Sequence, residues 1–264
     1  MEVLEKLYYA PRIESTQTQL IQLFQKGLNS EQYGIYSFNQ TQGKGQGTNT
    51  WNMDPESGLA ISLGFKISTK QEPHDWVAIN KHVSTLICTF LQRICEEPVY
   101  IKWPNDIMCR DKKLAGILMQ VIPFQEPPEI QLNINQSQFD KLFVVGLGLN
   151  LEPSQNTNPE IQDKIISLQE VNHSKIEDQH ILAQSLAGFL FDRGMNLPIQ
   201  KSKVHEYYEC CLWQLSETVV AQISIPQSQL LNAKLIGVDE SGRVLLKIEE
   251  EIMAFQHGDA RIMY

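Results

Sequence analysis

Between residues 99 and 151 the sequence consists of short apolar runs separated by turn residues, and this pattern constrains the fold more than any other feature. The runs are too short for typical helices, and several are rich in Val and Ile, which favours strands. Two similar runs precede them. We therefore expect strands at 33–39, 59–67, 99–103, 107–110, 114–122, 129–135 and 142–151. A sheet of this size needs helices to cover its apolar faces.

Apolar residues at helical spacing predict the covering helices. The expected helices lie near 15–26, 75–95, 177–192 and 201–215. In the first, Thr16, Leu20 and Phe24 share one face, and Thr16 with Gln19 has the spacing of a capping box. In the second, the shared face comprises Trp76, Ile79, Val83, Ile87, Phe90 and Ile94. In the fourth, the buried stripe comprises Val204, Tyr208, Cys211 and Leu215.

After residue 217 the pattern changes to short apolar runs separated by turns. We expect strands at 218–225, 230–238, 243–249 and 252–255, forming a small all-β unit. Alone, a unit of about 45 residues would bury little apolar surface. The predicted domains are 1–217 and 218–264, and the class is α+β: a mixed sheet flanked by helices, with a small C-terminal barrel.

Composition excludes some classes of function. The chain has 264 residues, a net charge of −9 and a sequence pI near 5.2, which argues against a general nucleic-acid binder. It has five cysteines without C-x-x-C spacing, so we expect reduced thiols rather than disulfides. No secretory signal pattern and no membrane-spanning apolar run occur, so a soluble cytoplasmic protein is expected.

The first candidate functional stretch is glycine-rich and covers residues 40–51. Alternating glycines, Gly43, Gly45 and Gly47, allow the backbone to approach a ligand closely. The stretch matches neither the P-loop nor the dinucleotide pattern. Two interpretations remain: a ligand-binding loop around Lys44, or a flexible surface loop.

The second stretch is Lys102-Trp103-Pro104-Asn105-Asp106. Pro104 favours extended geometry at Trp103 and ends the strand. Asn105 could then bind an adenine edge or a ribose, and Asp106 could hold Mg²⁺ through water. The alternative is a simple Pro-Asn-Asp turn.

Two further strands contain glycine where a buried strand normally has a side chain. The strand at 114–122 follows Lys112 and Lys113 and contains Gly116, and the strand at 142–151 contains Gly146 and Gly148 and runs to Asn150. Such glycines often mark close backbone approach. The alternatives are solvated edge lysines and a bulged core strand. The histidines show no H-x-x-x-H pair, which argues against a zinc site, and no G-x-S-x-G elbow occurs.

The order and spacing of these stretches closely resemble the biotin protein ligase family. The matching segments are Glu14-Ser15-Thr16-Gln17, Gln40 to Gly45 with Trp51, Lys102 to Asp106, Lys113 to Leu118, and Gly146 to Asn150. The resemblance covers nearly the whole chain. It implies the class II synthetase-like catalytic fold shared by biotin and lipoate ligases, with an SH3-like C-terminal domain, in the short class without an N-terminal DNA-binding domain.

The resemblance also implies an activity: biotin and ATP form biotinyl-adenylate, and biotin then passes to a lysine of a biotin carboxyl carrier domain. The implied catalytic residue is Lys113. The implied biotin-binding residues are Ser15, Thr16, Gln17, Gln40, Gly43, Lys44, Gly45, Gln46, Lys113, Gly116, Leu118 and Gly146. The implied ATP-binding residues are Lys44, Asn49, Trp51, Lys102, Asn105, Asp106, Lys113 and Asn150. Mg²⁺ is the implied ion, a homodimer is compatible, and no DNA or membrane partner is expected.

One departure from the family affects phosphate binding. Many members carry arginines in the glycine-rich loop where this chain has Lys44, Gln46 and Asn49. Lysine lacks the bidentate geometry of arginine, and the two amides carry no charge. Two other functions stay open: a lipoate or octanoate ligase or transferase, and a regulator that binds biotin or its adenylate without transferring it.

Overall fold

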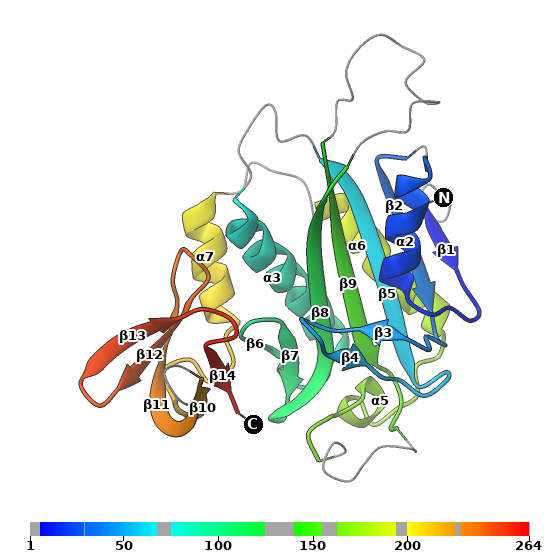
Figure 1. Cartoon of the computed structure of the whole chain (residues 1–264). Helices are drawn as coiled ribbons and strands as arrows, with labels where there is room; N and C mark the ends of the chain where they lie inside the picture. The colour runs from blue at the N-terminus through cyan, green and yellow to red at the C-terminus, as the bar shows by residue number, and fades with distance from the viewer. Residues whose placement is uncertain are drawn as a thin grey trace. The chain divides into compact units, whose positions relative to one another are not determined.

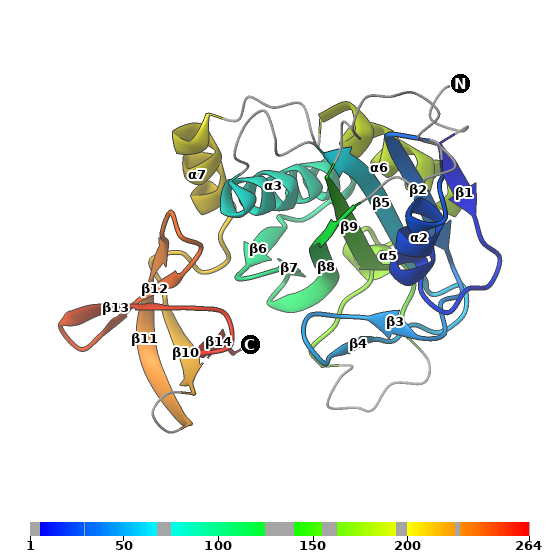
Figure 2. The same ribbon diagram turned by 45° about the horizontal axis from the view of Figure 1, so that its top comes forward.

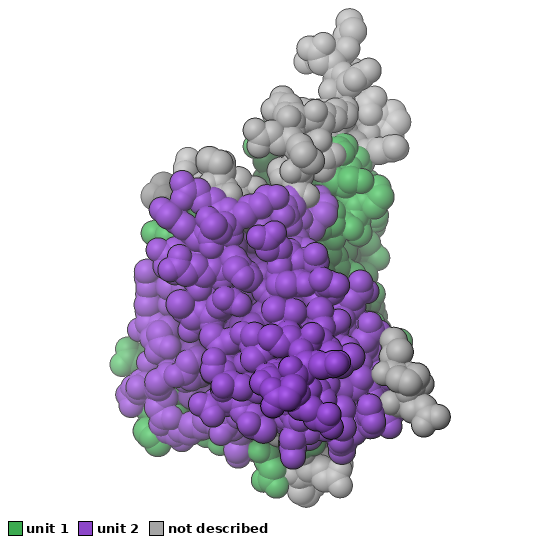
Figure 3. Space-filling model, turned by 90° about the vertical axis from the view of Figure 1, so that its left-hand side faces the viewer, with its two compact units in different colours: residues 1–74, 114–196 green, residues 75–113, 197–264 purple. Residues whose placement is uncertain are grey.

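The computed structural model describes residues 6–28, 30–67, 75–124, 140–154, 163–193, 200–224 and 228–263. The chain forms two compact units, one of residues 1–74 with 114–196 and one of residues 75–113 with 197–264 (Figure 3). Each unit is described separately below. The expected strand at 129–135 lies outside the described residues.

The first unit contains a mixed sheet. Its strands are β1 (Leu7–Tyr9), β2 (Gln32–Ser37), β5 (Gly58–Ile67), β9 (Lys141–Asn150) and β8 (Lys112–Pro123), which lie side by side in that order (Figure 1). β1 pairs with β2 in parallel, and the other neighbours pair antiparallel. β8 crosses the unit boundary, because Lys112 and Lys113 belong to the second unit. The predicted mixed sheet is confirmed.

Cross-strand register divides the first unit's sheet into two faces. Ser62 pairs with Gly146, which pairs with Leu118. Two residues along each strand, Ala60 pairs with Gly148, which pairs with Gly116. Because side chains alternate along strands and directly paired residues share a face, all six lie on one face. We call it the glycine face.

Helix α2 (Thr16–Gln25) packs on the glycine face. Leu20 and Phe24 are fully buried and lie against Gly64, as the predicted stripe requires. The N-cap is Ser15, whose side chain accepts a hydrogen bond from Thr18 N, so the proposed capping box of Thr16 with Gln19 is wrong. Helix α6 (Gln179–Arg193) covers the other face, where Phe191 contacts Phe65.

The glycine-rich stretch is more regular than expected. It contains a two-stranded hairpin of β3 (Gly43–Lys44) and β4 (Thr50–Trp51), closed further by a hydrogen bond from Gly45 N to Asn49 O. The expectation of a plain loop over 40–51 is therefore wrong in part. Apolar periodicity cannot reveal strands of two residues. The sequence pattern also missed β1 and the short helix α5 (Leu168–Val171).

The second unit contains two helices and a hairpin. These are α3 (Trp76–Ile94), α7 (Lys201–Cys210), β6 (Tyr100–Lys102) and β7 (Asp106–Cys109). α7 ends before the predicted residue 215 because the chain turns to pair with β6: Trp213 N donates to Ile101 O, and Gln214 and Ser216 have positive φ.

The C-terminal part of the second unit is a five-stranded antiparallel sheet. Its strands are β10 (Thr218–Ile223), β11 (Gln229–Val238), β12 (Val244–Ile248), β13 (Glu251–Phe255) and β14 (Ala260–Ile262), in the order β13-β12-β11-β10-β14 (Figure 2). Within residues 218–224 and 228–263 no pairing joins β13 to β14. The predicted small barrel is thus an antiparallel sheet that does not close, which is consistent with a small SH3-like domain. The last strand, β14, was not predicted.

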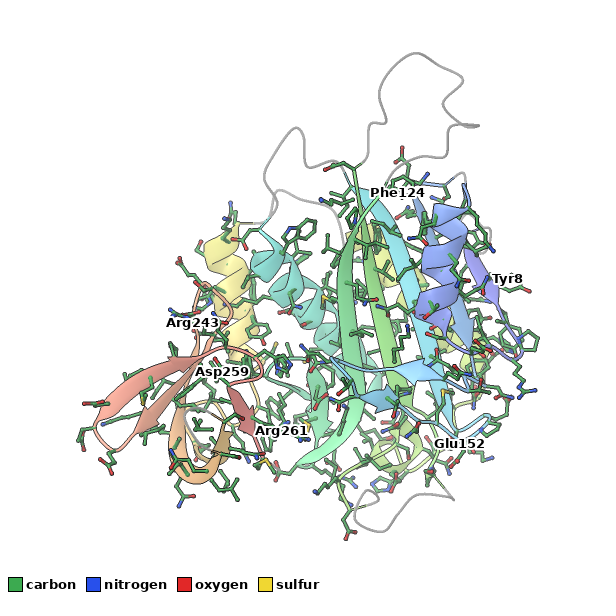
Figure 4. The ribbon with its side chains drawn as sticks, viewed as in Figure 1. Tyr8, Phe124, Glu152, Arg243, Asp259 and Arg261 are labelled. Atoms are coloured by element: carbon green, nitrogen blue, oxygen red, sulfur yellow. The ribbon has the colours of Figure 1, made fainter. Side chains whose placement is uncertain are left out.

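A buried lysine connects this sheet to the two helices of the second unit. Lys81 on α3 is 5% exposed, and its Nζ lies 2.8 Å from His205 Nδ1 of α7. The same Nζ donates to the backbone oxygens of Asp239, at 2.8 Å, and Val238, at 3.2 Å. Asp239 begins the turn between β11 and β12, where Arg243, labelled in Figure 4, binds its carboxylate. One ammonium group thus joins three elements.

Lys81→Met is expected to lower the free energy of unfolding by about 2–4 kcal/mol, because two carbonyl groups and one imidazole lose a buried charged donor. Chemical denaturation measures the change. Lys201→Met is the matched control: Lys201 pairs with Asp75 at 2.8 Å but is 69% exposed, so its loss should cost below about 1 kcal/mol. Equal costs for the two variants would contradict this assignment.

Candidate functional site

The N-terminus of α2 holds a cluster of buried polar side chains. Thr16 N and Thr16 Oγ1 both donate to Gln40 Oε1, at 2.8 Å and 3.2 Å. Thr16 Oγ1 also lies 2.9 Å from Ser62 Oγ on β5. Ser15, Thr16, Gln40 and Ser62 are all buried. Because buried polar groups are costly unless paired, this cluster fixes the orientation of each member.

Gln40 is positioned by the backbone on both sides. Residue 40 forms a parallel bridge with Ile13, and Thr41 N and Gln42 N donate to Ile13 O and Glu14 O. A Cβ atom on Gly43 would lie 2.5 Å from Gln40 Nε2, so only glycine leaves room for this amide. With Oε1 occupied by Thr16, the Nε2 end of Gln40 faces Gly43.

Two side chains lie on bare backbone of the glycine face. A Cβ atom on Gly146 would overlap Gln17 Oε1, and one on Gly148 would overlap the indole ring of Trp51. Gln17 is itself buried and donates from Nε2 to Gln120 Oε1 at 2.8 Å. The glycines in β9 are therefore required by close approach, and the alternative of a bulged core strand is wrong, since β9 pairs in regular register with both neighbours.

The remaining expected residues of the first unit differ in exposure. Lys44 and Asn49 are exposed at the hairpin, and Gln46 and Gly116 are partly buried. Asn150, at the end of β9, donates from Nδ2 to Ile166 O at 3.2 Å. Leu118, like Gly116, lies on the glycine face through its pairing in β8.

The second unit brings three charged residues together. The Asp106 carboxylate forms an ion pair with Lys113 Nζ at 2.6 Å and a longer one with Lys102 Nζ at 3.6 Å. Trp103, Pro104 and Asn105 form the turn between β6 and β7, so the turn interpretation holds, and the ion pairs form at its end. Trp103 is held by a hydrogen bond from Nε1 to Gly242 O at 3.0 Å and by ring contact with His257.

Lys102 is the buried member of this group, at 4% exposed. Burial lowers the pKa of Lys102 to about 8; Asp106 opposes this shift, and the positive charges of Arg261 and Lys113 add to it. Arg261 comes from β14 of the C-terminal sheet (Figure 4). The pKa of Lys102 is therefore about 8, whereas that of an ordinary lysine is near 10.4.

If Lys102 contributes its charge to binding ATP, the KM for ATP is expected to rise several-fold between pH 7 and pH 9, because Lys102 loses its proton near pH 8. The Lys102→Arg variant should show a flatter profile, since arginine stays charged. Steady-state kinetics at saturating biotin measure both. An identical slope in Lys102→Arg would assign the titration to another group.

The same pKa shift has the opposite effect on stability. Because the folded state disfavours the Lys102 ammonium, the charged side chain lowers the free energy of unfolding below about pH 8. This destabilisation disappears as the pH rises from about 8 toward about 10.4. Stability from this residue should thus increase from about pH 8 upward, whereas the affinity for ATP is predicted to fall between pH 7 and pH 9. The two measurements therefore separate binding from unfolding.

The structure thus places the expected residues in two groups, one in each unit. It adds two residues that the sequence pattern missed, Ser62 and Gln120. For Ser62 a signal was present: it is a polar residue within the otherwise apolar run 58–65. For Gln120, at the exposed end of β8, no local signal existed, because its partner is 103 positions away.

Two other sequence expectations concern metals and membranes. Within the described ranges, no three His, Cys, Asp or Glu side chains lie close enough to hold a metal ion, and the five cysteines are free thiols. Among the helices of those ranges, none has the length and hydropathy of a membrane span.

Residues 9–136 match the biotin/lipoate A/B protein ligase family. This segment contains the α2 cluster, the glycine-rich hairpin, the Lys102–Asp106–Lys113 group and Gly116. The chain matches that family over this segment, and its mixed sheet with flanking helices is the catalytic fold of biotin ligases.

The curated relatives are biotin protein ligases. The chain is 27% identical over 216 residues to the biotin–protein ligase of Schizosaccharomyces pombe, covering 76% of this chain and 33% of that protein. It is 22% identical over 233 residues to the bifunctional ligase/repressor BirA of Bacillus subtilis, covering 84% of this chain and 64% of that protein. The chain thus spans about one third to two thirds of these relatives.

Solved structures show the same fold over nearly the whole chain. The biotin protein ligase from Aquifex aeolicus, in complex with biotin and ATP, superposes with a TM-score of 0.70 at 22% identity, covering 98% of this chain and 99% of that one. The ligase from Leishmania major, in complex with biotinyl-5-AMP, superposes with a TM-score of 0.58 at 14% identity, covering 95% of this chain and 98% of that one. At these identities the likeness concerns the fold.

Proposed function

We propose that this chain is an ATP-dependent biotin protein ligase. The observation that carries the proposal is the Lys102–Asp106–Lys113 group in a domain of the ligase family: an acidic chain concentrates two cations where two anionic substrates must react. In the first step, a biotin carboxylate oxygen attacks the α-phosphorus of ATP, and pyrophosphate leaves. In the second, the amine of a carrier lysine attacks the carbonyl carbon of biotinyl-adenylate, and AMP leaves.

Lys113 is the proposed catalytic residue. Its ammonium can contact both the biotin carboxylate and the α-phosphate and stabilise the negative charge that increases in the transition state. Asp106 holds Lys113 Nζ at 2.6 Å, which orients the ammonium group. Strand β8 carries both Lys113, the proposed catalytic cation, and Gly116, a proposed biotin contact.

The proposed biotin-binding group is the cluster at the start of α2. Biotin's ureido ring presents two N–H donors and one carbonyl acceptor, which an apolar site could not satisfy. Ser15, Thr16, Gln17 and Gln40 offer buried hydroxyl and amide groups held in fixed orientations. The proposed contacts for adenine are Trp51 and Asn150. The other proposed ATP-binding residues, which would contact the ribose and phosphates, are Lys44, Asn49, Lys102 and Asn105.

Magnesium fits this protein only as a companion of the nucleotide. Asp106 is the acidic residue that the sequence suggested for it, and its carboxylate is already engaged by two lysines. Mg²⁺ usually keeps several waters and binds through substrate phosphates with one or two carboxylates. We therefore propose Mg²⁺ as part of the ATP substrate and derive no step through it.

The test is mass spectrometry of a purified biotin carboxyl carrier domain after incubation with this protein, biotin, ATP and Mg²⁺. A mass increase of one biotinyl group on one lysine is expected. Lipoate and octanoate in place of biotin test the alternative ligase activity. Biotin binding without transfer or AMP release would instead identify a regulator, and no transfer would overturn the proposal.

Three further points belong to the proposal. The functional partner is a carrier domain of a biotin-dependent carboxylase, and binding to DNA is not expected at a net charge of −9. The protein acts in the cytoplasm.

The domain boundary lies near residue 217, directly before β10, and the C-terminal sheet supports the Trp103 turn through Gly242 and His257.

A further inference from the structure

Gln120 is a residue to which neither the motifs nor the proposed chemistry assigns a role. It lies on β8, two positions beyond Leu118, and pairs with Val144 of β9. That register places it on the glycine face. Although Gln120 itself is exposed, its Oε1 accepts the hydrogen bond from Nε2 of Gln17, whose side chain is 4% exposed.

In the structure Gln120 turns its Oε1 toward Gln17, and this bond occupies the Nε2 end of the Gln17 amide. A glutamine amide can rotate by half a turn and exchange its oxygen and nitrogen with little change in shape. With Nε2 committed to Gln120, Oε1 is directed over the bare backbone of Gly146. Gln17 therefore presents an acceptor, not a donor, beside the Thr16–Gln40–Ser62 cluster.

We infer that Gln120 is a positioning residue that sets the hydrogen-bonding polarity of the biotin site by orienting the Gln17 amide. The inference rests on the proposed function. The ligand chemistry that matches is an N–H donor of the ureido ring, which a Gln17 carbonyl oxygen can accept and a Gln17 NH₂ group cannot. Gln120 acts through Gln17 and does not touch the substrate.

Three substitutions at residue 120 separate orientation from mere contact. Gln120→Glu retains an acceptor and cannot donate, so it should keep Gln17 in the same orientation and leave the KM for biotin within about twofold. Gln120→Leu removes the acceptor and should raise that KM about fivefold, as expected for one net hydrogen bond. Gln120→Lys offers only donors, should turn Gln17 Oε1 toward residue 120, and should raise the KM at least as much as Gln120→Leu.

The kinetic pattern distinguishes this role from a structural one. The KM for biotin should change while kcat at saturating biotin and the KM for ATP stay within about twofold, because the reacting carboxylate and phosphate are not touched. Gln25→Leu is the matched control, since Gln25 is an exposed glutamine at the end of α2. Thermal unfolding of each variant excludes loss of the fold.

The results also separate this inference from the proposed function. If the wild-type protein neither binds biotin in calorimetry nor transfers it, the proposed function fails first. If the wild type is active and Gln120→Leu keeps the wild-type KM for biotin, the positioning role is wrong. It is also wrong if Gln120→Glu loses as much affinity as Gln120→Lys, because charge and size would then matter rather than hydrogen-bond direction.

Discussion

Lys113→Ala is expected to slow pyrophosphate release in a single turnover by about 10²–10³-fold, the usual effect of losing one preorganised electrostatic contact. The lysine side chain is 23% exposed, and its partner Asp106 retains the ion pair with Lys102, so the fold should persist. The missing charge would otherwise face a carboxylate and a phosphate that must approach to bonding distance. Quenched-flow measurement with biotin and ATP, without carrier, reports this step alone.

The control for this prediction is the neighbouring lysine. Side chains alternate along a strand, so Lys112 is expected to point away from Lys113, and Lys112→Ala should retain most activity. Lys113→Arg gives a second comparison: it keeps the positive charge but not the compact ammonium. Normal pyrophosphate release by Lys113→Ala, or an equal loss in Lys112→Ala, would show that the catalytic lysine is wrongly assigned.

Gly148→Ala is expected to raise the KM for ATP about tenfold, the scale of losing a base stacked on an aromatic ring. A Cβ atom at this position would overlap three atoms of the Trp51 indole, so the ring must leave the glycine face. If adenine stacks on Trp51, as proposed, a displaced ring offers no platform. A cost in stability of about 1–3 kcal/mol should accompany the change, since the site is tightly packed.

A double-mutant cycle identifies the cause. Trp51→Ala removes the ring, so adding Gly148→Ala in that background should have almost no further effect on the KM for ATP. Additive effects of the two substitutions would mean that Gly148 acts independently of Trp51, for example through the pairing of β9 with β5 and β8. In that case the proposed role of the ring would lose its structural support.

Local pattern was sufficient to predict most of the secondary structure. The stripe of Leu20 and Phe24 on α2, the long helix α3 and the strands β5, β8 and β9 follow from periodicity that is written within each segment. Where the signal was shorter than one period it failed, as in the two-residue strands β3 and β4. The C-terminal strands were also found, but the sequence could not show that they form an open sheet.

Candidate residues could be selected from the sequence because glycine, proline and charge are unusual within apolar strands. Their arrangement could not. Thr16, Gln40 and Ser62 are separated by 24 and 46 positions and meet only because α2 packs on β5 and residue 40 pairs beside Ile13. The contact between Trp51 and Gly148 likewise depends on where the hairpin folds relative to β9.

The sequence by itself thus determined most of the helices and strands and which residues are candidates for the chemistry, because burial periodicity and residue type are local properties. Only the tertiary structure decided which residues share a face. Antiparallel register decides that, and a shift of one position would move Gly146, Gly148 and Gln120 to the opposite side of the sheet. Gln17 and Gln120, 103 positions apart, illustrate the difference: each is an ordinary glutamine until the register of β8 brings them within 2.8 Å.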